Sequence, residues 1–281
     1  MNISPIIQAS ELLGLYPTES IILIDATNGK NAKENYQRKH LKGALFVDLN
    51  TQLADIKPDV SDGGRHPLPT VEQFAETLTE LGISKNSHVV VYDDKNGSNA
   101  AARFWWMLKS VGHKKVQVLN GGLREAEKIG FPITNEKEEV HKKENYNVKK
   151  WVLPMSNILE IEKASENDDY IIIDVRDNQR YKGKTEPIDS IAGHIPGAIN
   201  VPFSTNLDAD ELFFKSNELR HKYEKIFKNK SADKIIVHCG SGVTACHTLL
   251  AFAYAGLKIP KLYVGSWSEW SGNNKKVATE V

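Results

Sequence analysis

The chain has 281 residues, and its 36 Lys and Arg balance 36 Asp and Glu, so the formal net charge is zero. This balance gives no reason to expect nucleic acid or an anionic membrane as a partner, although a local pocket can still be basic and bind an anionic small substrate. No apolar run approaches the roughly 20 residues of a membrane span, and the N-terminus does not resemble a signal peptide. The two cysteines, Cys239 and Cys246, form no disulfide framework, so we expect a reducing, cytoplasmic compartment.

Four blocks of the first half recur in the same order in the second half. The apolar run that ends at Asp25 recurs as the run that ends at Asp174, and the block that begins at His40 recurs at His194. The other two pairs are 88–112 with 234–256 and 116–123 with 261–268. The matching blocks are separated by about 150 residues in each case, so we interpret the chain as two copies of one domain. The predicted boundaries are 1–136 and 151–281, with a charge-dense linker over 137–150.

Short apolar runs alternate with helical patterns along both copies. Continuous apolar runs of this kind are typical of parallel strands that are buried on both faces. They predict strands at 21–25, 89–93, 116–120, 170–174, 234–238 and 261–265. Helical spacing predicts helices at 69–82, at 98–112 with Ser98 or Asn99 as the cap, and at 244–256. The alternation predicts an α/β fold, in which each copy is a mainly parallel sheet flanked by helices on both faces.

Cys239 stands at the end of a predicted strand and directly before a glycine-rich loop, 240-GSGVT-244. Parallel α/β sheets bind ligands beyond the carboxyl ends of their strands, near helix N-termini. Two glycines allow this loop to curl and to point several backbone N–H groups inward, which favours an anion and therefore a nucleophilic thiolate. The alternative is a buried structural cysteine. Cys246 falls inside the next predicted helix, where core packing is favoured over a resolving thiol, and the spacing is poor for zinc.

Two chemistries use a cysteine in such a loop. Cysteine-dependent phosphatases need an arginine six residues after the cysteine to clamp the phosphate, and Ala245 occupies that position here. Sulfur transfer needs only the thiolate, a cradle of N–H groups and a cation for the anionic end of the donor. The pattern therefore favours sulfur transfer. No dinucleotide fingerprint and no His/Cys cluster with metal spacing is present in the sequence, so we expect neither a cofactor nor a metal.

The chain resembles the two-domain rhodanese-type sulfurtransferases. The motifs that carry the resemblance are 194-HIPGAIN, 239-CGSGVTA, 263-YVGSWSEW, 103-RFWWMLKSVGH and 119-LNGGL, and it spans about residues 8 to 272. The resemblance implies tandem rhodanese-like domains, of which the second is catalytic. The first is implied to be inactive, because Asp93 or Asp94 stands where the second has Cys239.

The resemblance also implies roles for single residues. Cys239 would form a persulfide, held by the N–H groups of residues 240 to 244 (Gly240, Ser241, Gly242, Val243 and Thr244). Arg180 would bind the carboxylate or sulfonate end of the donor, the alternative being an exposed surface arginine. Ser241 would polarise the donor carbonyl or relay a proton, with His66 as its partner. The acidic residue of that relay is replaced by Asn50, so His66 is either a relay member or a residue that lines the cleft.

The identity of the donor is less determined. The uncharged residues Gly240 and Ser241 favour 3-mercaptopyruvate, but the second arginine that mercaptopyruvate enzymes carry before the GHIPG segment is absent from 185-TEPIDSIAGH. The alternatives are a thiosulfate:cyanide sulfurtransferase and a non-catalytic module that senses or binds persulfides. The expected partners are a small anionic sulfur donor and a thiol or cyanide acceptor, including a protein thiol such as a thioredoxin. We interpret Asp174 with Arg176 as structural, and His40 and His194 as packing residues.

Overall fold

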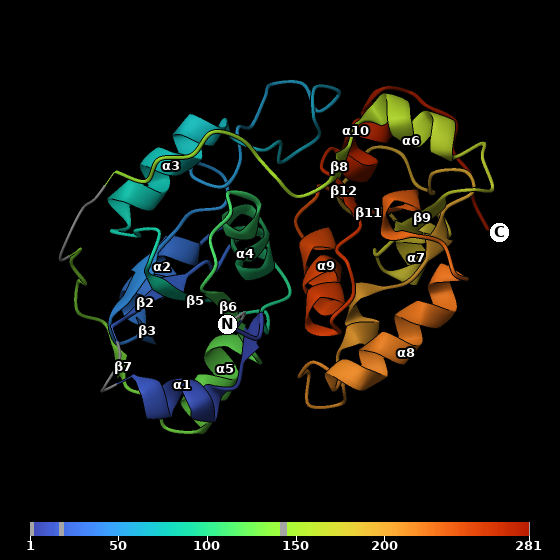
Figure 1. Cartoon of the computed structure of the whole chain (residues 1–281). Helices are drawn as coiled ribbons and strands as arrows, with labels where there is room; N and C mark the ends of the chain where they lie inside the picture. The colour runs from blue at the N-terminus through green and yellow to red at the C-terminus, as the bar shows by residue number, and fades with distance from the viewer. Residues whose placement is uncertain (1–2, 17–19, 141–144, 281) are drawn as a thin grey trace. The chain divides into compact units, whose positions relative to one another are not determined.

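The computed structural model describes residues 3–16, 20–140 and 145–280 (Figure 1). Residues 141–144 of the expected linker, and the domain ends at 1–2 and 281, lie outside the described residues. The chain divides into two compact units. The first contains Met1–Asp55, Pro69–Val152 and Ala209–Phe213, and the second contains Ile56–Leu68, Leu153–Asp208 and Phe214–Val281. The segment Ile56–Leu68 of the first repeat therefore belongs to the second unit, and the segment Ala209–Phe213 of the second repeat belongs to the first unit.

The first unit is built on a parallel five-stranded sheet in the order β4-β2-β5-β6-β1. The strands are β1 (Ile6–Ile7), β2 (Ile21–Asp25), β4 (Ala44–Phe46), β5 (His88–Tyr92) and β6 (Val116–Leu119). A short antiparallel pair joins β3 (His40–Leu41) to β7 (Ile133–Thr134). The helices are α1 (Ala9–Leu15), α2 (Ala32–Arg38), α3 (Val71–Glu80), α4 (Ala100–Ser110) and α5 (Gly122–Lys128).

Strand β5 shows why its sheet needs cover on both faces. Successive side chains of a strand point to opposite faces, so Val90 and Tyr92 lie on one face and Val89 and Val91 on the other. All four are fully buried. Val90 and Tyr92 belong to an apolar cluster with residues of α1 and α5, while α4 packs against β5 and β6. Each buried branched side chain stabilises the fold by about 1.5–3 kcal/mol, which explains the continuous apolar runs.

The N-terminus of α4 agrees only in part with the sequence prediction. Asn99 occupies the N-cap position, but neither it nor Ser98 caps the helix with its side chain, and Ser98 Oγ donates to the carbonyl of Lys95 instead. The carboxylate of Asp93 accepts hydrogen bonds from the amides of Asn99 and Ala101, both at 3.1 Å. The predicted N-cap position at Asn99 is confirmed, but a buried acid from the end of β5, and not a local side chain, satisfies these amides.

The second unit repeats the architecture with the strand order β10-β9-β11-β12-β8, again all parallel. The strands are β8 (Met155–Ser156), β9 (Ile171–Asp174), β10 (Ile199–Asn200), β11 (Ile235–His238) and β12 (Lys261–Tyr263). The helices are α6 (Ile158–Ala164), α7 (Asn178–Tyr181), α8 (Ser216–Phe227), α9 (Ala245–Tyr254) and α10 (Ser266–Gly272), with 3₁₀ turns η1 (Phe203–Asn206) and η2 (Ala232–Lys234). The two sheets have the same order, and the predicted α/β class is confirmed.

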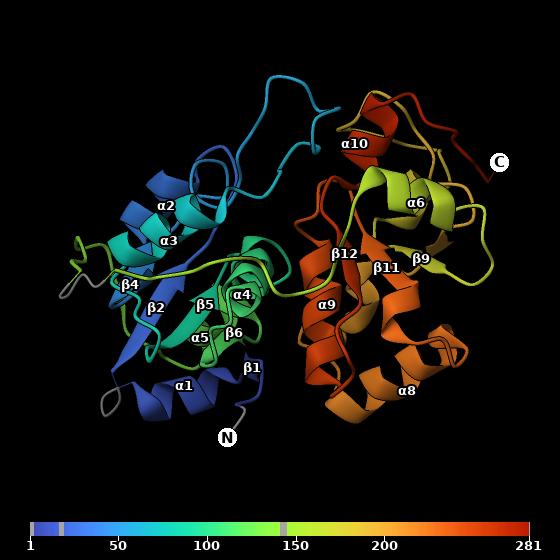
Figure 2. The ribbon, with the colours of Figure 1, turned by 45° about the horizontal axis from the view of Figure 1, so that its top comes forward.

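Helices cover both faces of this second sheet. Ile172 and Ile236 share an apolar cluster with residues of α6 and α10, such as Ile161 and Trp267. On the opposite face α9 packs against β11 and β12, and α8 lies alongside α9 in both views (Figures 1 and 2). None of the described helices is long and apolar enough to cross a membrane.

The two matching histidines of the repeat, His40 and His194, make the same contacts in their own units. His40 Nδ1 lies 2.7 Å from the carbonyl of Tyr36 and its ring stacks on that tyrosine. His194 Nδ1 lies 2.8 Å from the carbonyl of Tyr181, on which it also stacks. Both imidazoles are buried, which agrees with packing roles.

Candidate active site

Cys239 follows the last residue of β11 and is 3% exposed. The neighbouring strand β9 ends at Asp174, which lies opposite His238 in the sheet register. The loop 240–244 then leads into α9 at Ala245. The thiol therefore lies at the carboxyl edge of the second sheet, where the sequence predicts a ligand site.

The loop after Cys239 is oriented by the N-terminus of α10. The carbonyl oxygens of Cys239 and Gly240 accept hydrogen bonds from the amides of Trp267 (3.0 Å) and Ser268 (2.9 Å). The C=O and N–H of a trans peptide point in opposite directions, so the next two amides in the loop point away from α10. Gly242 has φ of +72°, and a Cβ there would lie 2.4 Å from the carbonyl oxygen of Val264, so only glycine fits this turn.

Four amides of the loop donate to no acceptor in the part of the chain that the structure describes. The four concerned are those of Gly240, Ser241, Val243 and Thr244. Three of these residues are buried and Thr244 is half-buried, so water can satisfy their N–H groups only within the site. A set of N–H groups at the start of a helix stabilises an anion. The predicted cradle residues therefore do lie together around the end of β11.

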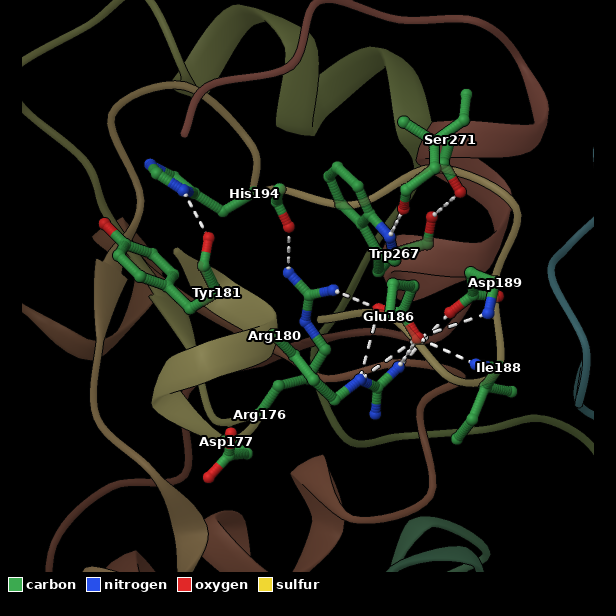
Figure 3. A network of polar contacts seen from close by, with 12 residues as sticks. Arg176, Asp177, Arg180, Tyr181, Glu186, Ile188, Asp189, His194, Trp267 and Ser271 are labelled. Atoms are coloured by element: carbon green, nitrogen blue, oxygen red, sulfur yellow. Dashed lines mark hydrogen bonds and ion pairs between the residues drawn. The ribbon is translucent and has the colours of Figure 1, made fainter. Parts of the chain in front are cut away.

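Arg180 lies beside this loop and is not a surface arginine. Its Nε lies 3.1 Å from both carboxylate oxygens of Glu186, and its Nη2 lies 2.7 Å from Glu186 and 3.4 Å from Asp189 (Figure 3). The side chain is 17% exposed. The two terminal nitrogens lie 3.5 and 3.7 Å from the point that a Cβ on Gly240 would occupy. The structure thus brings Arg180 and the Cys239 loop together.

Arg176, four residues earlier and before the start of α7, has a different environment. Its guanidinium is buried and donates to Asp174 at 2.6 Å and to the carbonyl of Gly193 at 2.6 Å. It also donates to Glu186 at 3.3 Å (Figure 3) and lies over the ring of Trp267. Burial alone would raise the pKa of Asp174, but positive charge nearby (His238 when it is protonated, and Arg176) and the hydrogen bonds from Arg176 outweigh it and lower that pKa. Burial also lowers the pKa of His238, so the imidazole is neutral near pH 7 and Arg176 is the partner that keeps Asp174 ionised. Arg176 is structural, as interpreted from the sequence.

The segment Ile56–Leu68 reaches the site by packing on α10. The amide of Gly63 donates to Glu269 (3.2 Å), and that of Arg65 donates to Ser268 Oγ (3.0 Å). Gly64 has φ of +82°, and a Cβ on it would lie 2.3 Å from the carbonyl oxygen of Gly265. Only glycine permits this approach, which places the next two residues, Arg65 and His66, at the loop.

His66 meets Ser241 in the second unit. The distance between His66 Nδ1 and Ser241 Oγ is 2.8 Å, a hydrogen bond in either direction. Asn50 and Asp48 belong to the first unit, where the Asp48 carboxylate accepts the amides of Asn50 (2.8 Å) and Thr51 (2.9 Å). The structure therefore supports the His66–Ser241 pair, and Asp48 serves a local turn.

Arg65 was not singled out from the sequence. It forms an ion pair with Asp189 through Nη1, and its Nη2 lies 3.0 Å from the point that a Cβ on Gly240 would occupy. The available signal was its place directly before His66 in 63-GGRHPLP. Since its contacts lie more than a hundred residues away along the chain, the local pattern could not reveal them.

The corresponding loop of the first unit is filled by a carboxyl group of its own. Asp93 follows β5 as Cys239 follows β11, and it is fully buried. Its carboxylate accepts the amides of four residues at 2.8 to 3.1 Å, namely Lys95, Gly97, Asn99 and Ala101. Burial raises the pKa of Asp93, against the lowering effect of these four hydrogen bonds. This loop has no thiol, and its cradle is filled by its own side chain.

Cys246 lies inside α9 and is fully buried, and its thiol donates to the carbonyl of Gly242 at 3.3 Å. Neither cysteine is part of a disulfide within the described residues. Among the described residues no group of three or more His, Cys, Asp or Glu side chains is arranged to hold a metal ion.

Comparisons with known proteins agree on one family. The family model for the rhodanese-like domain matches residues 8–128 and again 158–273. The chain is 36% identical over 237 residues to the "Probable 3-mercaptopyruvate sulfurtransferase" of Pseudomonas aeruginosa (84% of this chain, 82% of that protein). It is 34% identical to the 3-mercaptopyruvate sulfurtransferase of Homo sapiens and 38% identical to the thiosulfate sulfurtransferase of Cricetulus griseus, each over 86% of this chain and 80% of the relative.

Solved structures give the same result. The 3-mercaptopyruvate sulfurtransferase of Leishmania major superposes with a TM-score of 0.83 at 27% identity, covering 96% of this chain and 75% of that one. The 3-mercaptopyruvate sulfotransferase of Escherichia coli superposes with a TM-score of 0.76 at 32% identity, covering 95% of this chain and 100% of that one. Relatives with both donor names match at similar identity, so identity alone does not choose between the donors.

Proposed function

This chain belongs to the rhodanese-like family and is a sulfurtransferase, and we propose that it moves a sulfane sulfur from 3-mercaptopyruvate to a thiophilic acceptor through a persulfide on Cys239. The observation that carries the proposal is the buried thiol at the end of β11, next to a loop whose amides at Gly240, Ser241, Val243 and Thr244 donate to no described residue. Such amides stabilise both the attacking thiolate and the persulfide anion that replaces it.

In the first half-reaction, the Cys239 thiolate attacks the sulfur of the donor. An S–S bond forms, the C–S bond breaks, and its electron pair passes to the donor carbon as the enolate of pyruvate. The thiol proton of the donor ends on that carbon, so pyruvate leaves and the cysteine holds a persulfide anion. This is covalent catalysis in two steps. In the second half-reaction, a thiolate or cyanide attacks the outer sulfur and the Cys239 thiolate is released.

The residues around the thiol suit the two ends of the donor. The guanidinium of Arg180 lies at the loop and can donate to the donor carboxylate by charge-assisted hydrogen bonds. Ser241, in contact with His66 at 2.8 Å, can donate its hydroxyl proton to the donor carbonyl as the enolate forms. A donor with one carboxylate and one carbonyl uses both groups, and the loop positions 240 and 241 carry no charge. These features support 3-mercaptopyruvate.

Thiosulfate is the second candidate donor. It is favoured by the match of this chain to thiosulfate sulfurtransferases at up to 38% identity. Thiosulfate has no carbonyl group for Ser241 to polarise, so a Ser241→Ala variant separates the donors. We expect a large loss of kcat/KM, about 10-fold or more, with 3-mercaptopyruvate, and little change with thiosulfate.

The two repeats divide the work in this proposal. The copy over 151–281 provides the nucleophile, and the copy over 1–136 is inactive because Asp93 fills its anion cradle. We further infer a reducing compartment such as the cytoplasm, since neither cysteine is part of a disulfide within the described residues. A protein thiol such as a thioredoxin is then a suitable acceptor beside cyanide and small thiols.

Steady-state kinetics test the proposal. Wild type and the Cys239→Ser and Cys246→Ser variants are assayed with 3-mercaptopyruvate or thiosulfate, with cyanide or dithiothreitol as acceptor. We expect loss of turnover for Cys239→Ser and near wild-type turnover for Cys246→Ser. Absence of turnover with either donor in a folded wild-type protein would leave the non-catalytic persulfide-binding module as the function. Equal turnover of wild type and Cys239→Ser would exclude the persulfide mechanism.

A further inference from the structure

Two guanidinium groups converge on the loop that follows Cys239. Arg65 Nη2 lies 3.0 Å, and the terminal nitrogens of Arg180 lie 3.5 and 3.7 Å, from the point that a Cβ on Gly240 would occupy. The φ angle of Gly240 is not in the left-handed region, so its backbone conformation does not require glycine. The ends of the two arginine side chains border the space that a side chain at position 240 would enter.

Each arginine is held by an acid on one edge and presents its other edge to the loop. Arg180 binds Glu186 through Nε and Nη2, and Arg65 binds Asp189 through Nη1. Within the described ranges, Nη1 of Arg180 and Nη2 of Arg65 donate to no residue. Arg65 Nη2 is the arginine nitrogen nearest the Cβ point of Gly240, and Arg180 Nη1 lies 3.7 Å from that point, slightly farther than the Nη2 that binds Glu186. One anion at the loop can therefore accept from Arg65 Nη2 and Arg180 Nη1.

The exposure of the four side chains shows which charges a donor meets first. The acids are nearly inaccessible, at 3% for Glu186 and 7% for Asp189, while Arg180 is 17% and Arg65 is 23% exposed. The acids orient the arginines from behind, and the accessible face of the cluster is cationic.

We propose, resting on the proposed function, that Arg65 is a donor-binding residue that shares the anionic end of the sulfur donor with Arg180. Neither the loop positions 240 and 241 nor the residues on either side of Asp189, Ile188 and Ser190, carry a positive charge. The second positive charge beside Arg180 is therefore supplied by Arg65 from the segment Ile56–Leu68. Gly64 allows that segment to approach Gly265, and this contact brings Arg65 to the loop.

A merely structural role makes a different prediction. If Arg65 served only to neutralise Asp189, removing both charges together would restore the site. If Arg65 contacts the donor, the double variant still lacks the guanidinium that binds the donor, and donor binding is not restored. The Arg65→Gln and Asp189→Asn variants and their combination therefore separate the two roles.

The experiment measures KM and kcat of wild type, Arg65→Gln, Arg65→Lys and Arg65→Gln/Asp189→Asn with 3-mercaptopyruvate and with thiosulfate. We expect Arg65→Gln to raise KM about 10- to 100-fold, as for loss of one charge-assisted hydrogen bond. The rise should be larger for thiosulfate, which carries two charges, and Arg65→Lys should show a smaller rise. The double variant should keep the high KM. The matched control is Arg220→Gln, which removes a surface arginine paired with Glu224 on α8 and should change neither constant.

Two results would overturn the inference: an unchanged KM in Arg65→Gln, or a double variant whose KM returns to the wild-type value. Intact mass of wild type incubated with donor separates this from the proposed function. A wild type that gains one sulfur while Arg65→Gln keeps its KM refutes only the role of Arg65. A folded wild type that gains no sulfur from either donor refutes the proposed function itself.

Discussion

Arg176 and Arg180 are four residues apart, yet their substitution should give opposite phenotypes. The Arg176 guanidinium is 1% exposed and supplies the positive charge between Asp174 and Glu186, which are 0% and 3% exposed. In an Arg176→Gln variant both carboxylates lose this charge while they stay buried. Breaking a buried ion pair by removing one partner costs about 3–5 kcal/mol.

The same change at Arg180 is expected to leave the fold nearly intact. Arg180 is 17% exposed and Glu186 keeps its contact with Arg176, so Arg180→Gln should lower the free energy of unfolding by about 1 kcal/mol. Its effect should fall on the donor, with a KM for 3-mercaptopyruvate raised about 10- to 100-fold.

Thermal and urea unfolding, together with steady-state kinetics, check this contrast. For a unit of this size, 3–5 kcal/mol corresponds to a fall in Tm of roughly 10 °C or more for Arg176→Gln. The reasoning is refuted if Arg176→Gln unfolds at the wild-type Tm, or if Arg180→Gln is destabilised as strongly as Arg176→Gln with an unchanged KM.

Two further predictions concern stability. Asp93→Ala leaves the amides of Lys95, Gly97, Asn99 and Ala101 without an acceptor, and two of these residues, Gly97 and Ala101, are buried. The variant should lower the free energy of unfolding by about 3 kcal/mol or more, with a smaller loss for Asp93→Asn, while Cys239 still accepts sulfur from the donor. Wild-type stability in urea would contradict this. Burial, with the charge of Lys222, lowers the pKa of His247 to about 3. An unfolded histidine titrates near 6.5, so the stability that neutral His247 contributes is fully present above that pH and is lost as pH falls toward about 3. The loss in free energy of unfolding reaches about 2 kcal/mol at pH 5. Urea unfolding of wild type and His247→Phe at pH 7 and pH 5 should show the smaller pH dependence in the variant, and equal dependence would refute this.

The strands with strong apolar runs could be predicted from the sequence. The run 21–25 is β2, and the runs around 89–93 and 234–238 become β5 and β11 with shifts of one residue. The edge strands β1 and β8 could not be predicted, because each has two residues and shows no periodicity. These two strands form only because they pair with β6 and β12, which are distant in the sequence, and a local pattern does not report such contacts.

The site divides in the same way. The cysteine loop is local in sequence, and its glycines, Gly240 and Gly242, are enough by themselves to indicate a curled backbone. The contact of Ser241 with His66 came from the family resemblance, because the two residues are 175 positions apart. The place of Arg65 needs the packing of Gly64 on Gly265, and no local pattern reports that contact.

The most direct test of the central claim is the intact mass of the protein after incubation with one equivalent of 3-mercaptopyruvate and no acceptor. We expect wild type to gain the mass of one sulfur atom, to release an equal amount of pyruvate, and to lose the sulfur again when cyanide is added, while Cys239→Ser gains nothing. Sulfur gained equally by Cys239→Ser, or no gain in a folded wild type with either donor, would contradict that claim.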